Sequence, residues 1–243
     1  MFIKFIHEEP FFISKHPEKI NKNITIKYNQ MLRQKSKFEY YDKAFDYIYN
    51  NHHNGDYFEF GIHKARTFNM ALIISKIKGI KMNFYAFDSF NGLPDLTIYG
   101  GGCDNLKENK NYITGTLKTT EKDFDKLIKK NISGRKITKI KGFYKDSLNK
   151  ELIKKFYKEK IKTSFVCIDC DLNRSIIESL NFSFNFMING CVLYIDDFFN
   201  LASGDPKNML NKIIKKIAKK NNKKLVDWHL VGSFGKSYLV FDS

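Results

Sequence analysis

From residue 57 onward the chain alternates between short strand-like runs and longer helix-like runs, and this alternation limits its fold more than any other feature. Five apolar runs predict strands, at 57–61, 82–88, 136–142, 164–169 and 191–196. Helical periodicity predicts helices at 66–78, 121–131, 147–158, 175–188 and 205–220. Such alternation predicts right-handed crossovers and a mainly parallel sheet covered by helices on both faces. Two last strand-like runs, 224–231 and 236–242, predict a closing antiparallel hairpin, so we expect an α/β fold with seven strands.

The segments outside this alternation are the N-terminus and one long loop. Residues 1–36 show no regular pattern, whereas aromatic residues at helical spacing predict a helix from residue 38 to about residue 54. We therefore expect residues 1–50 to form a helical and irregular extension. The connection 95–118 is long for a strand-to-helix loop, and loops of this length are usually functional lids or disordered. Because there is no internal repeat or linker-like segment, we interpret 1–243 as a single domain with 95–118 as its substrate loop.

The formal net charge of +16 raises the question of nucleic-acid binding. Nearly all of the excess is lysine, whereas recognition of phosphates and base edges usually relies on arginine. We therefore expect no nucleic-acid partner, although an acidic small substrate is compatible with the charge. No window reaches the roughly 20 apolar residues of a membrane span. Cys167 and Cys170 have a C-x-x-C spacing, but no second cysteine pair accompanies them, which argues against a zinc or redox site. We therefore expect buried, reduced thiols and a cytoplasmic protein.

Ligands of open α/β sheets bind at the carboxyl ends of the parallel strands, so the residues that follow each strand are the first candidates for a site. Gly61 ends the first strand and lets the backbone approach a ligand, and the helix after it offers free N–H groups to an anion. Asp88 ends the second strand, where it could accept hydrogen bonds from ribose hydroxyls or, alternatively, cap a helix. Gly142 and Phe143 end the third strand, and Phe143 could pack on an adenine ring or in the core. The chain has no G-x-G-x-x-G motif, which argues against a nicotinamide oxidoreductase.

Acidic residues follow the fourth and fifth strands. Asp169 and Asp171 come after the fourth, and Asp196 and Asp197 come after the fifth. Neighbouring parallel strands lie about 4.8 Å apart, so we expect these carboxylates to converge and to need a neutralising cation. A hard divalent cation such as Mg²⁺ suits these oxygen ligands, and it would polarise a substrate hydroxyl beside Asp169 as the general base. Helix capping, for example by Asp171, is the alternative, but it does not explain the pair Asp196 and Asp197.

Five blocks of the sequence resemble the macrocin O-methyltransferase (TylF-like) family in order and spacing. They are GDYFEFGIHKARTF (55–68), AFDSFNGLPD (86–95), KGFYKDSL (141–148), IDCDLNRSIIESL (168–180) and GCVLYIDDF (190–198). The resemblance covers about residues 50–200. It implies a Rossmann-like class I methyltransferase fold with S-adenosylmethionine as methyl donor and, typically, a sugar hydroxyl as acceptor. It also implies that Asp169, Asp196 and Asp197 hold Mg²⁺.

The same resemblance assigns the cofactor site. The predicted cofactor-binding residues are Glu59, Gly61, Thr67, Asp88, Ser89, Gly142, Phe143 and Asp169. The chain departs from the family pattern at two positions. Ala65 stands where the family usually has a second glycine, which tightens the cofactor loop. Asn173 stands where a tyrosine usually follows D-L, so the substrate side could differ.

From these residues we expect a Mg²⁺-assisted O-methyltransferase that acts on a sugar hydroxyl. The lysine excess favours an acceptor with phosphate, such as a nucleotide-linked sugar in surface-polysaccharide synthesis. The alternatives are a methyltransferase for nucleic acid or another small molecule, and a catalytically silent binding protein with the same fold. Amino-methylating nucleic-acid enzymes usually carry an N/D-P-P-Y/F turn after the fourth strand, and this chain lacks it. The intact acidic cluster argues against a silent protein, and a homo-oligomer is compatible with the sequence.

Overall fold

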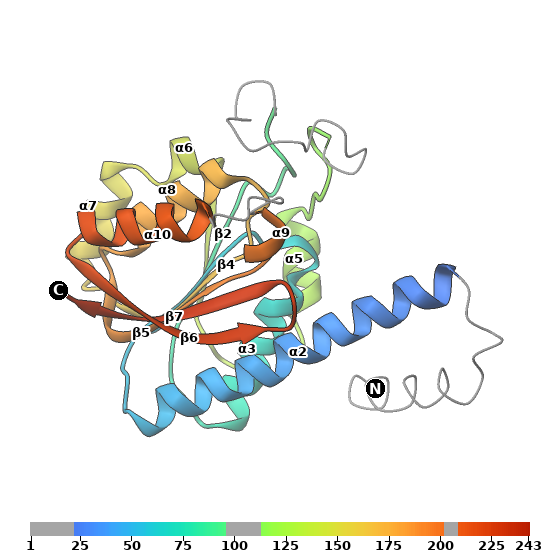
Figure 1. The fold of residues 1–243 in the computed structure, drawn as a ribbon, viewed down its shortest axis with the longest axis horizontal. Coiled ribbons are helices and arrows are strands. Elements are labelled where there is room, and N and C mark those ends of the chain that lie inside the picture. Colours follow the sequence, from blue (N-terminus) through green and yellow to red (C-terminus); the bar gives the residue numbers. More distant parts are fainter. Residues whose placement is uncertain (1–21, 96–112, 202–208) are drawn as a thin grey trace.

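The computed structural model describes residues 22–95, 113–201 and 209–243, and in these ranges seven strands form one sheet in the order β3-β2-β1-β4-β5-β7-β6 (Figure 1). The strands are β1 Asp56–Phe60, β2 Phe84–Asp88, β3 Ile137–Lys141, β4 Thr163–Ile168, β5 Met187–Ile195, β6 Lys223–Val231 and β7 Gly235–Asp242. Strands β1 to β5 pair in parallel, whereas β7 pairs antiparallel with both β5 and β6. The expected mainly parallel seven-stranded sheet with a C-terminal antiparallel hairpin is confirmed.

Helices connect these strands and cover both faces of the sheet. They are α2 Lys22–Asn50, the short 3₁₀ helix η2 His63–Ala65, α3 Arg66–Ile77, α5 Glu121–Ile128, α6 Tyr144–Ser147, α7 Lys150–Lys158, α8 Asn173–Ser183, α9 Phe198–Leu201 and α10 Met209–Lys220. The helix expected at 147–158 is instead two helices, because the Asn149 side chain accepts a hydrogen bond from Leu152 N and caps the start of α7. The helix expected at 175–188 ends at Ser183, and β5 begins already at Met187.

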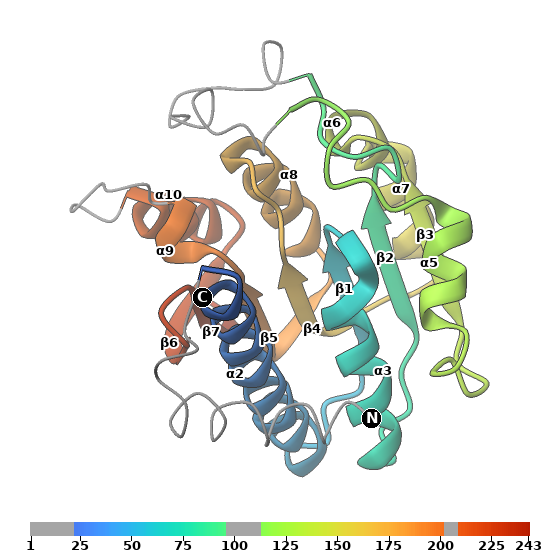
Figure 2. The ribbon, with the colours of Figure 1, turned by 90° about the vertical axis from the view of Figure 1, so that its right-hand side faces the viewer.

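Side chains alternate between the two faces along each central strand, as the pleat of a strand requires. In β4, Phe165 and Cys167 pack into the core under α2 and α3, whereas Val166 and Ile168 pack into the core under α7, α8 and α10. Figure 1 shows α2 and α3 on one face and α7, α8 and α10 on the other, and Figure 2 shows the same layers from the side. Both faces are therefore buried, which explains the nearly continuous apolar runs of these strands.

Helix α2 is longer than the sequence pattern indicated. Residues 22–36 were expected to be irregular, but they continue the helix that ends at Asn50, over 29 residues in all. Only the second half of α2 has an apolar face, where Tyr41, Phe45 and Ile48 pack on the sheet. The first half is largely polar and extends beyond the sheet (Figure 1), so it lacks the hydrophobic periodicity by which a helix is recognised. It has no glycine or proline, and it propagates from the packed half.

The strand registers bring the predicted site residues to one edge of the sheet. Phe60 of β1 is opposite Phe87 of β2 and Ile168 of β4, and Ile168 is opposite Ile195 of β5. The residues that directly follow these four, Gly61, Asp88, Asp169 and Asp196, therefore lie side by side at the carboxyl edge.

Some expectations fall outside the described residues. Of the expected substrate loop 95–118, residues 96–112 lie outside them, as do residues 1–21 of the N-terminal extension and residues 205–208 of the last expected helix. In the part of the chain that is described, no helix is both long enough and apolar enough to cross a membrane.

Candidate active site

A cavity of about 520 Å³ opens at the carboxyl edge of the sheet. It is lined by most of the residues that the sequence predicted for the site: Gly61, Thr67, Asp88, Ser89, Gly142, Phe143, Asp169, Asp196 and Asp197. These residues come from the ends of five strands and from the start of α3. One predicted residue, Glu59, does not line the cavity, because its side chain is fully buried behind it.

Gly61 allows two strand ends to approach each other. Its φ of +90° lies in the region that favours glycine, and a Cβ at this position would meet the carbonyl oxygen of Asp169 at 2.1 Å. The Gly61 N–H donates to Phe87 O at 2.9 Å, which ties the turn to β2. The absence of a side chain at Gly61 is therefore required to bring Asp169 close to the loop that follows β1.

The loop after Gly61 contains two more left-handed residues. Lys64 has a φ of +58°, and Ala65, which directly precedes α3, has a φ of +48°. Left-handed backbone is costly for residues other than glycine, asparagine and aspartate. The family's usual glycine at the position of Ala65 fits this backbone conformation without strain.

Asp88 holds this loop in place from the neighbouring strand. Its Oδ2 accepts a hydrogen bond from Ile62 N at 2.7 Å, and its Oδ1 accepts one from Phe90 N at 2.6 Å. Burial raises the pKa of Asp88, and the two backbone hydrogen bonds oppose that rise. Each carboxylate oxygen has two lone pairs, so Asp88 keeps the capacity to accept further hydrogen bonds from a ligand in the cavity.

Glu59 makes its contacts inside the protein. Its Oε1 accepts a hydrogen bond from Thr67 Oγ1 at 2.6 Å, and its Oε2 accepts one from the hydroxyl of Tyr57. Burial raises the pKa of Glu59 to about 7, against the effect of these two hydrogen bonds. Its role as a direct cofactor ligand stays a prediction, and the geometry gives it a different task. It positions Thr67, which does line the cavity at the start of α3.

Gly142 and Phe143 form the wall of the cavity beside β2 and β3. Gly142 N donates to the carbonyl oxygen of Asp88 at 3.0 Å, and Gly142 has a φ of +133°. Phe143 lines the cavity, is only partly buried and is not a member of either hydrophobic core. This position suits a flat apolar ligand group.

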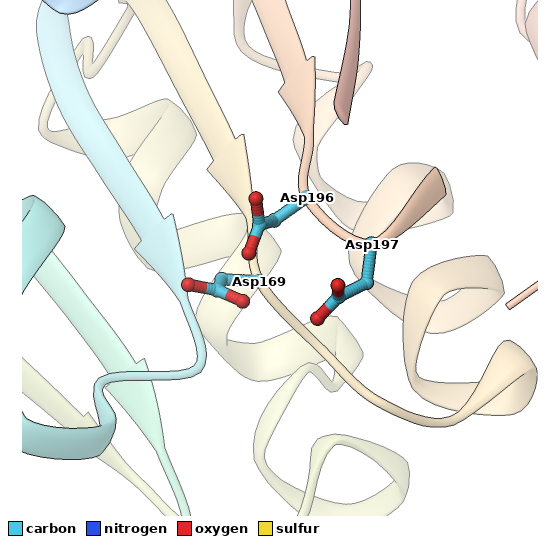
Figure 3. A group of neighbouring side chains, drawn as sticks. All are labelled: Asp169, Asp196 and Asp197. Carbon is cyan, nitrogen blue, oxygen red and sulfur yellow. The ribbon is translucent and has the colours of Figure 1, made fainter. Parts of the chain in front are cut away.

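Asp169, Asp196 and Asp197 converge at the ends of β4 and β5, as the sequence predicted. Each offers an oxygen that lies within 4.8 Å of an oxygen from each of the other two (Figure 3). The Asp196 side chain is only 1% exposed, whereas those of Asp197 and Asp169 are 19% and 29% exposed. The residue that precedes α8 is Leu172, so Asp171 is not its capping residue.

Two basic side chains from α2 contact these carboxylates, and neither was among the residues predicted from the sequence. Lys37 Nζ lies 2.6 Å from Asp196 Oδ2 and 3.6 Å from Asp169 Oδ2. Arg33 Nη2 lies 3.0 Å from the same Asp196 oxygen and also contacts Asp197 Oδ1. Their spacing of four residues puts them on one face of α2, but that signal is only interpretable once the helix is known to extend through residue 33.

The charges of this cluster set the pKa values of its carboxyl groups. Burial alone would raise the pKa of Asp196, but the charges of Lys37 and Arg33 outweigh it and lower that pKa. Burial and the nearby negative charge of Asp196 raise the pKa of Asp169 well above its usual value, although Lys37 opposes the rise. Asp196 therefore stays ionised, whereas Asp169 binds a proton more readily than an ordinary aspartate.

The donor set of this cluster fits a hard divalent cation. Three carboxylates on neighbouring strand ends offer the oxygen ligands that Mg²⁺ prefers. The side chains of Lys37 and Arg33 also bring positive charge to the cluster. The repulsion expected between its carboxylates is therefore already reduced without a metal. A hydroxyl in the cavity beside Asp169 would have a carboxylate within reach to take its proton.

The comparisons with known proteins agree with this architecture. The sequence matches the Macrocin-O-methyltransferase (TylF) family over residues 27–227. The structure is similar to that of the O-methyltransferase NovP, with a TM-score of 0.65 and 16% identity over 84% of this chain and 79% of that one. It is also similar to CalS11, a calicheamicin methyltransferase, with a TM-score of 0.62 and 13% identity over 96% of this chain and 91% of that one.

A third similar structure is that of the methyltransferase MycE from the mycinamycin biosynthetic pathway, solved in complex with Mg and SAH. Its TM-score is 0.50 at 13% identity, over 84% of this chain and 49% of that one. No curated protein sequence matched the chain. At these identities the solved structures establish the fold, whereas the family match, which spans most of the chain, establishes the family. The protein thus belongs to the macrocin O-methyltransferase (TylF) family and is an S-adenosylmethionine-dependent O-methyltransferase.

Proposed function

We propose that the protein methylates a sugar hydroxyl and that a divalent cation, Mg²⁺ or a similar ion, assists the reaction at Asp169, Asp196 and Asp197. The observation that carries this proposal is the convergence of the three carboxylates in the same cavity as Gly61 and Asp88. A site for a methyl donor and a site for a hydroxyl acceptor would then share one cavity, with Asp169 between them.

The cofactor would lie along the ends of β1, β2 and β3. Gly61 and Thr67 would face the methionine part, where the free N–H groups at the start of α3 can bind its carboxylate. Asp88, with Ser89 beside it, would accept hydrogen bonds from the ribose hydroxyls. Gly142 and Phe143 would border the adenine, with the Phe143 ring against its face.

Methyl transfer would form an O–CH₃ bond as the S–CH₃ bond breaks, and the proton of the hydroxyl would pass to a carboxylate oxygen of Asp169. The bound cation would supply Lewis-acid polarisation of that hydroxyl. Positive charge at the site also lowers the raised pKa of Asp169, so that its carboxylate is ionised and free to accept the proton. Lys37 contributes part of this charge from the protein side. Orientation of the hydroxyl in line with the sulfonium would supply much of the acceleration.

The acceptor we propose is a nucleotide-linked sugar, as used in surface-polysaccharide synthesis. One of the similar structures, apo CalS11, is described as a TDP-rhamnose 3'-O-methyltransferase. The net charge of +16 suits an acceptor that carries phosphate. Arg66, which lies at the start of α3, is exposed and adds a cation to the lining of the cavity.

The proposal is tested by supplying the purified protein with isotopically labelled S-adenosylmethionine and Mg²⁺ and offering it nucleotide sugars, the matching free sugars, RNA and DNA. Mass spectrometry would identify the methylated product and the position of the methyl group. We expect transfer to a hydroxyl of a nucleotide sugar, with slower turnover of the free sugar. Equal turnover of the two would contradict the phosphate requirement, and transfer to RNA or DNA would overturn the sugar assignment.

A further inference from the structure

Arg33 occupies a position between two of the three carboxylates proposed to bind the metal. A single nitrogen, Nη2, contacts both Asp196 Oδ2 and Asp197 Oδ1. A divalent cation bound to these same oxygens would have to lie in the space between them. The guanidinium and such a cation therefore require the same place.

The hydrogen bonds of Asp196 support this exclusion. Its Oδ1 accepts a bond from the Tyr194 hydroxyl at 2.5 Å, and its Oδ2 accepts bonds from both Lys37 and Arg33. A carboxylate oxygen has two lone pairs, so Oδ2 has none left for a metal while both cations are bound to it. One of the two basic side chains has to withdraw before this oxygen can coordinate.

Burial indicates which of the two withdraws. The Lys37 side chain is 6% exposed and lies deep between Asp169 and Asp196, whereas the Arg33 side chain is 32% exposed at the wall of the cavity. The Arg33 guanidinium also rests on the ring of Phe234, 4.4 Å from its centroid. The charge balance agrees: three carboxylates with Lys37 leave two negative charges, which a divalent cation neutralises without Arg33.

From this geometry we propose that Arg33 is an internal competitor of the divalent cation. It neutralises Asp196 and Asp197 in the metal-free protein, and metal binding displaces it from both carboxylates while Lys37 remains in place. Arg33 thus lowers the affinity of the site for metal and is a positioning residue for the carboxylates. This inference rests on the proposed metal site and adds the displacement of Arg33 to it.

The test is a titration of metal-free protein with Mn²⁺, followed by calorimetry and by electron paramagnetic resonance, without S-adenosylmethionine or acceptor. Three proteins are compared: wild type, Arg33→Met and Lys35→Met. Lys35 is the matched control because it lies on the same helix and carries the same charge, but within the described residues its ion pair is with Glu39 at the surface. Methionine keeps a good helix former at both positions.

We expect Arg33→Met to bind Mn²⁺ at least tenfold more tightly than wild type, a difference of about 1.4 kcal/mol. Lys35→Met is expected to stay within about twofold of wild type, as a surface ion pair predicts. Arg33→Gln serves as a second variant if Arg33→Met does not fold, and it is expected to change the affinity in the same direction. Equal Mn²⁺ affinity of wild type and the Arg33 variant would overturn the competition while leaving the metal site intact. No Mn²⁺ binding by any of the three proteins would overturn the metal site and the competition together.

Discussion

At the scale of single residues, the buried carboxylates of this site differ in task because their partners differ. Glu59 is fully buried and bound by two hydroxyl groups, from Tyr57 and Thr67, and no cation among the described residues forms an ion pair with it. Asp196 is equally buried but is bound by Lys37 and Arg33. Burial therefore raises the pKa of Glu59 to about 7, whereas the pKa of Asp196 falls. The hydroxyl donors hold Glu59 in position without overcoming the effect of its burial, whereas the two cations at Asp196 outweigh the effect of burial on its pKa.

The raised pKa of Glu59 predicts how stability depends on pH. The folded-state pKa of about 7 lies above the usual value of about 4.3 for an unfolded glutamate, so the folded state holds the proton more tightly. The stabilisation that protonated Glu59 contributes is complete below the pKa of the unfolded state. It is lost as the pH rises through the pKa of the folded state. The Glu59→Gln variant has no ionisable side chain at this position, so its stability lacks this dependence on pH. Between about pH 5 and pH 8, wild type should therefore lose stability relative to Glu59→Gln, by as much as about 3 kcal/mol.

Urea unfolding of both proteins at several pH values measures this difference. Thr67→Val is the matched control, because it removes a hydrogen bond to Glu59 and leaves the ionisable group in place. Its stability relative to wild type should change much less over the same range of pH. A constant difference between wild type and Glu59→Gln from pH 5 to pH 8 would show that Glu59 titrates normally.

At the scale of elements, α2 has two roles in one helix. Its second half is a packing element, with Tyr41 and Phe45 fully buried against the sheet. About one and two turns before Tyr41, Lys37 and Arg33 extend toward the ends of β4 and β5. Asp169 and Asp196 lie two positions after Cys167 and Tyr194, whose side chains pack in the core under α2 and α3. Because side chains alternate along a strand, the carboxylates and the two cations meet on this side of the sheet. The acidic cluster is therefore completed by two residues of α2 that precede Asp196 by 163 and 159 positions in the chain.

Removing Lys37 should destabilise the metal-free protein. Its ammonium lies between Asp169 and Asp196, and removing one partner of a buried ion pair typically costs about 3–5 kcal/mol because the other charge is left uncompensated. Arg33 still contacts Asp196 in the variant, so we expect Lys37→Met to lower the free energy of unfolding by at most this amount. Added Mn²⁺ should recover part of the loss, since a ligand that binds only the folded state stabilises it.

Urea unfolding in EDTA and in Mn²⁺ measures both effects, with Lys35→Met as the surface control on the same helix. The control should lose less than about 1 kcal/mol. Lys37→Met unfolding at the same urea concentration as wild type in EDTA would contradict the view that Lys37 stabilises the acidic cluster.

Sequence patterns predicted the strand-end part of the site but not the part contributed by α2. Gly61, Asp88, Asp169 and Asp196 each end a strand with a clear apolar pattern, and parallel pairing then determines that they share an edge. Arg33 and Lys37 lie in a helix whose first half has no apolar periodicity, and their contact with Asp196 is a long-range pairing that no local pattern encodes. Likewise, the sequence places Gly61 at the end of a strand, but only the structure shows why a glycine is needed there. A Cβ on residue 61 would lie 2.1 Å from the carbonyl oxygen of Asp169.

At the scale of the whole molecule, the parallel order of β3, β2, β1, β4 and β5 arranges the cavity along one line. The carboxyl ends of β1 to β3 provide Gly61, Asp88 and Gly142, and the carboxyl ends of β4 and β5 provide the three carboxylates. In the proposed function, the first group binds the methyl donor and the second activates the acceptor, so donor and acceptor meet where β1 and β4 are neighbours. The close approach of Gly61 to Asp169 lies at this junction.

The measurement that tests this account most directly is the dependence of methyl transfer on a divalent metal, with cofactor binding followed in parallel by calorimetry. We expect EDTA to abolish turnover while S-adenosylmethionine still binds, and we expect added Mg²⁺ to restore turnover. Asp196→Asn and Asp197→Asn should need more Mg²⁺, whereas Asp169→Asn should remain slow even at saturating Mg²⁺ because the base is lost. Full turnover in EDTA, with no bound metal by elemental analysis, would contradict the account and leave Asp169 and the cations of α2 to act without a metal.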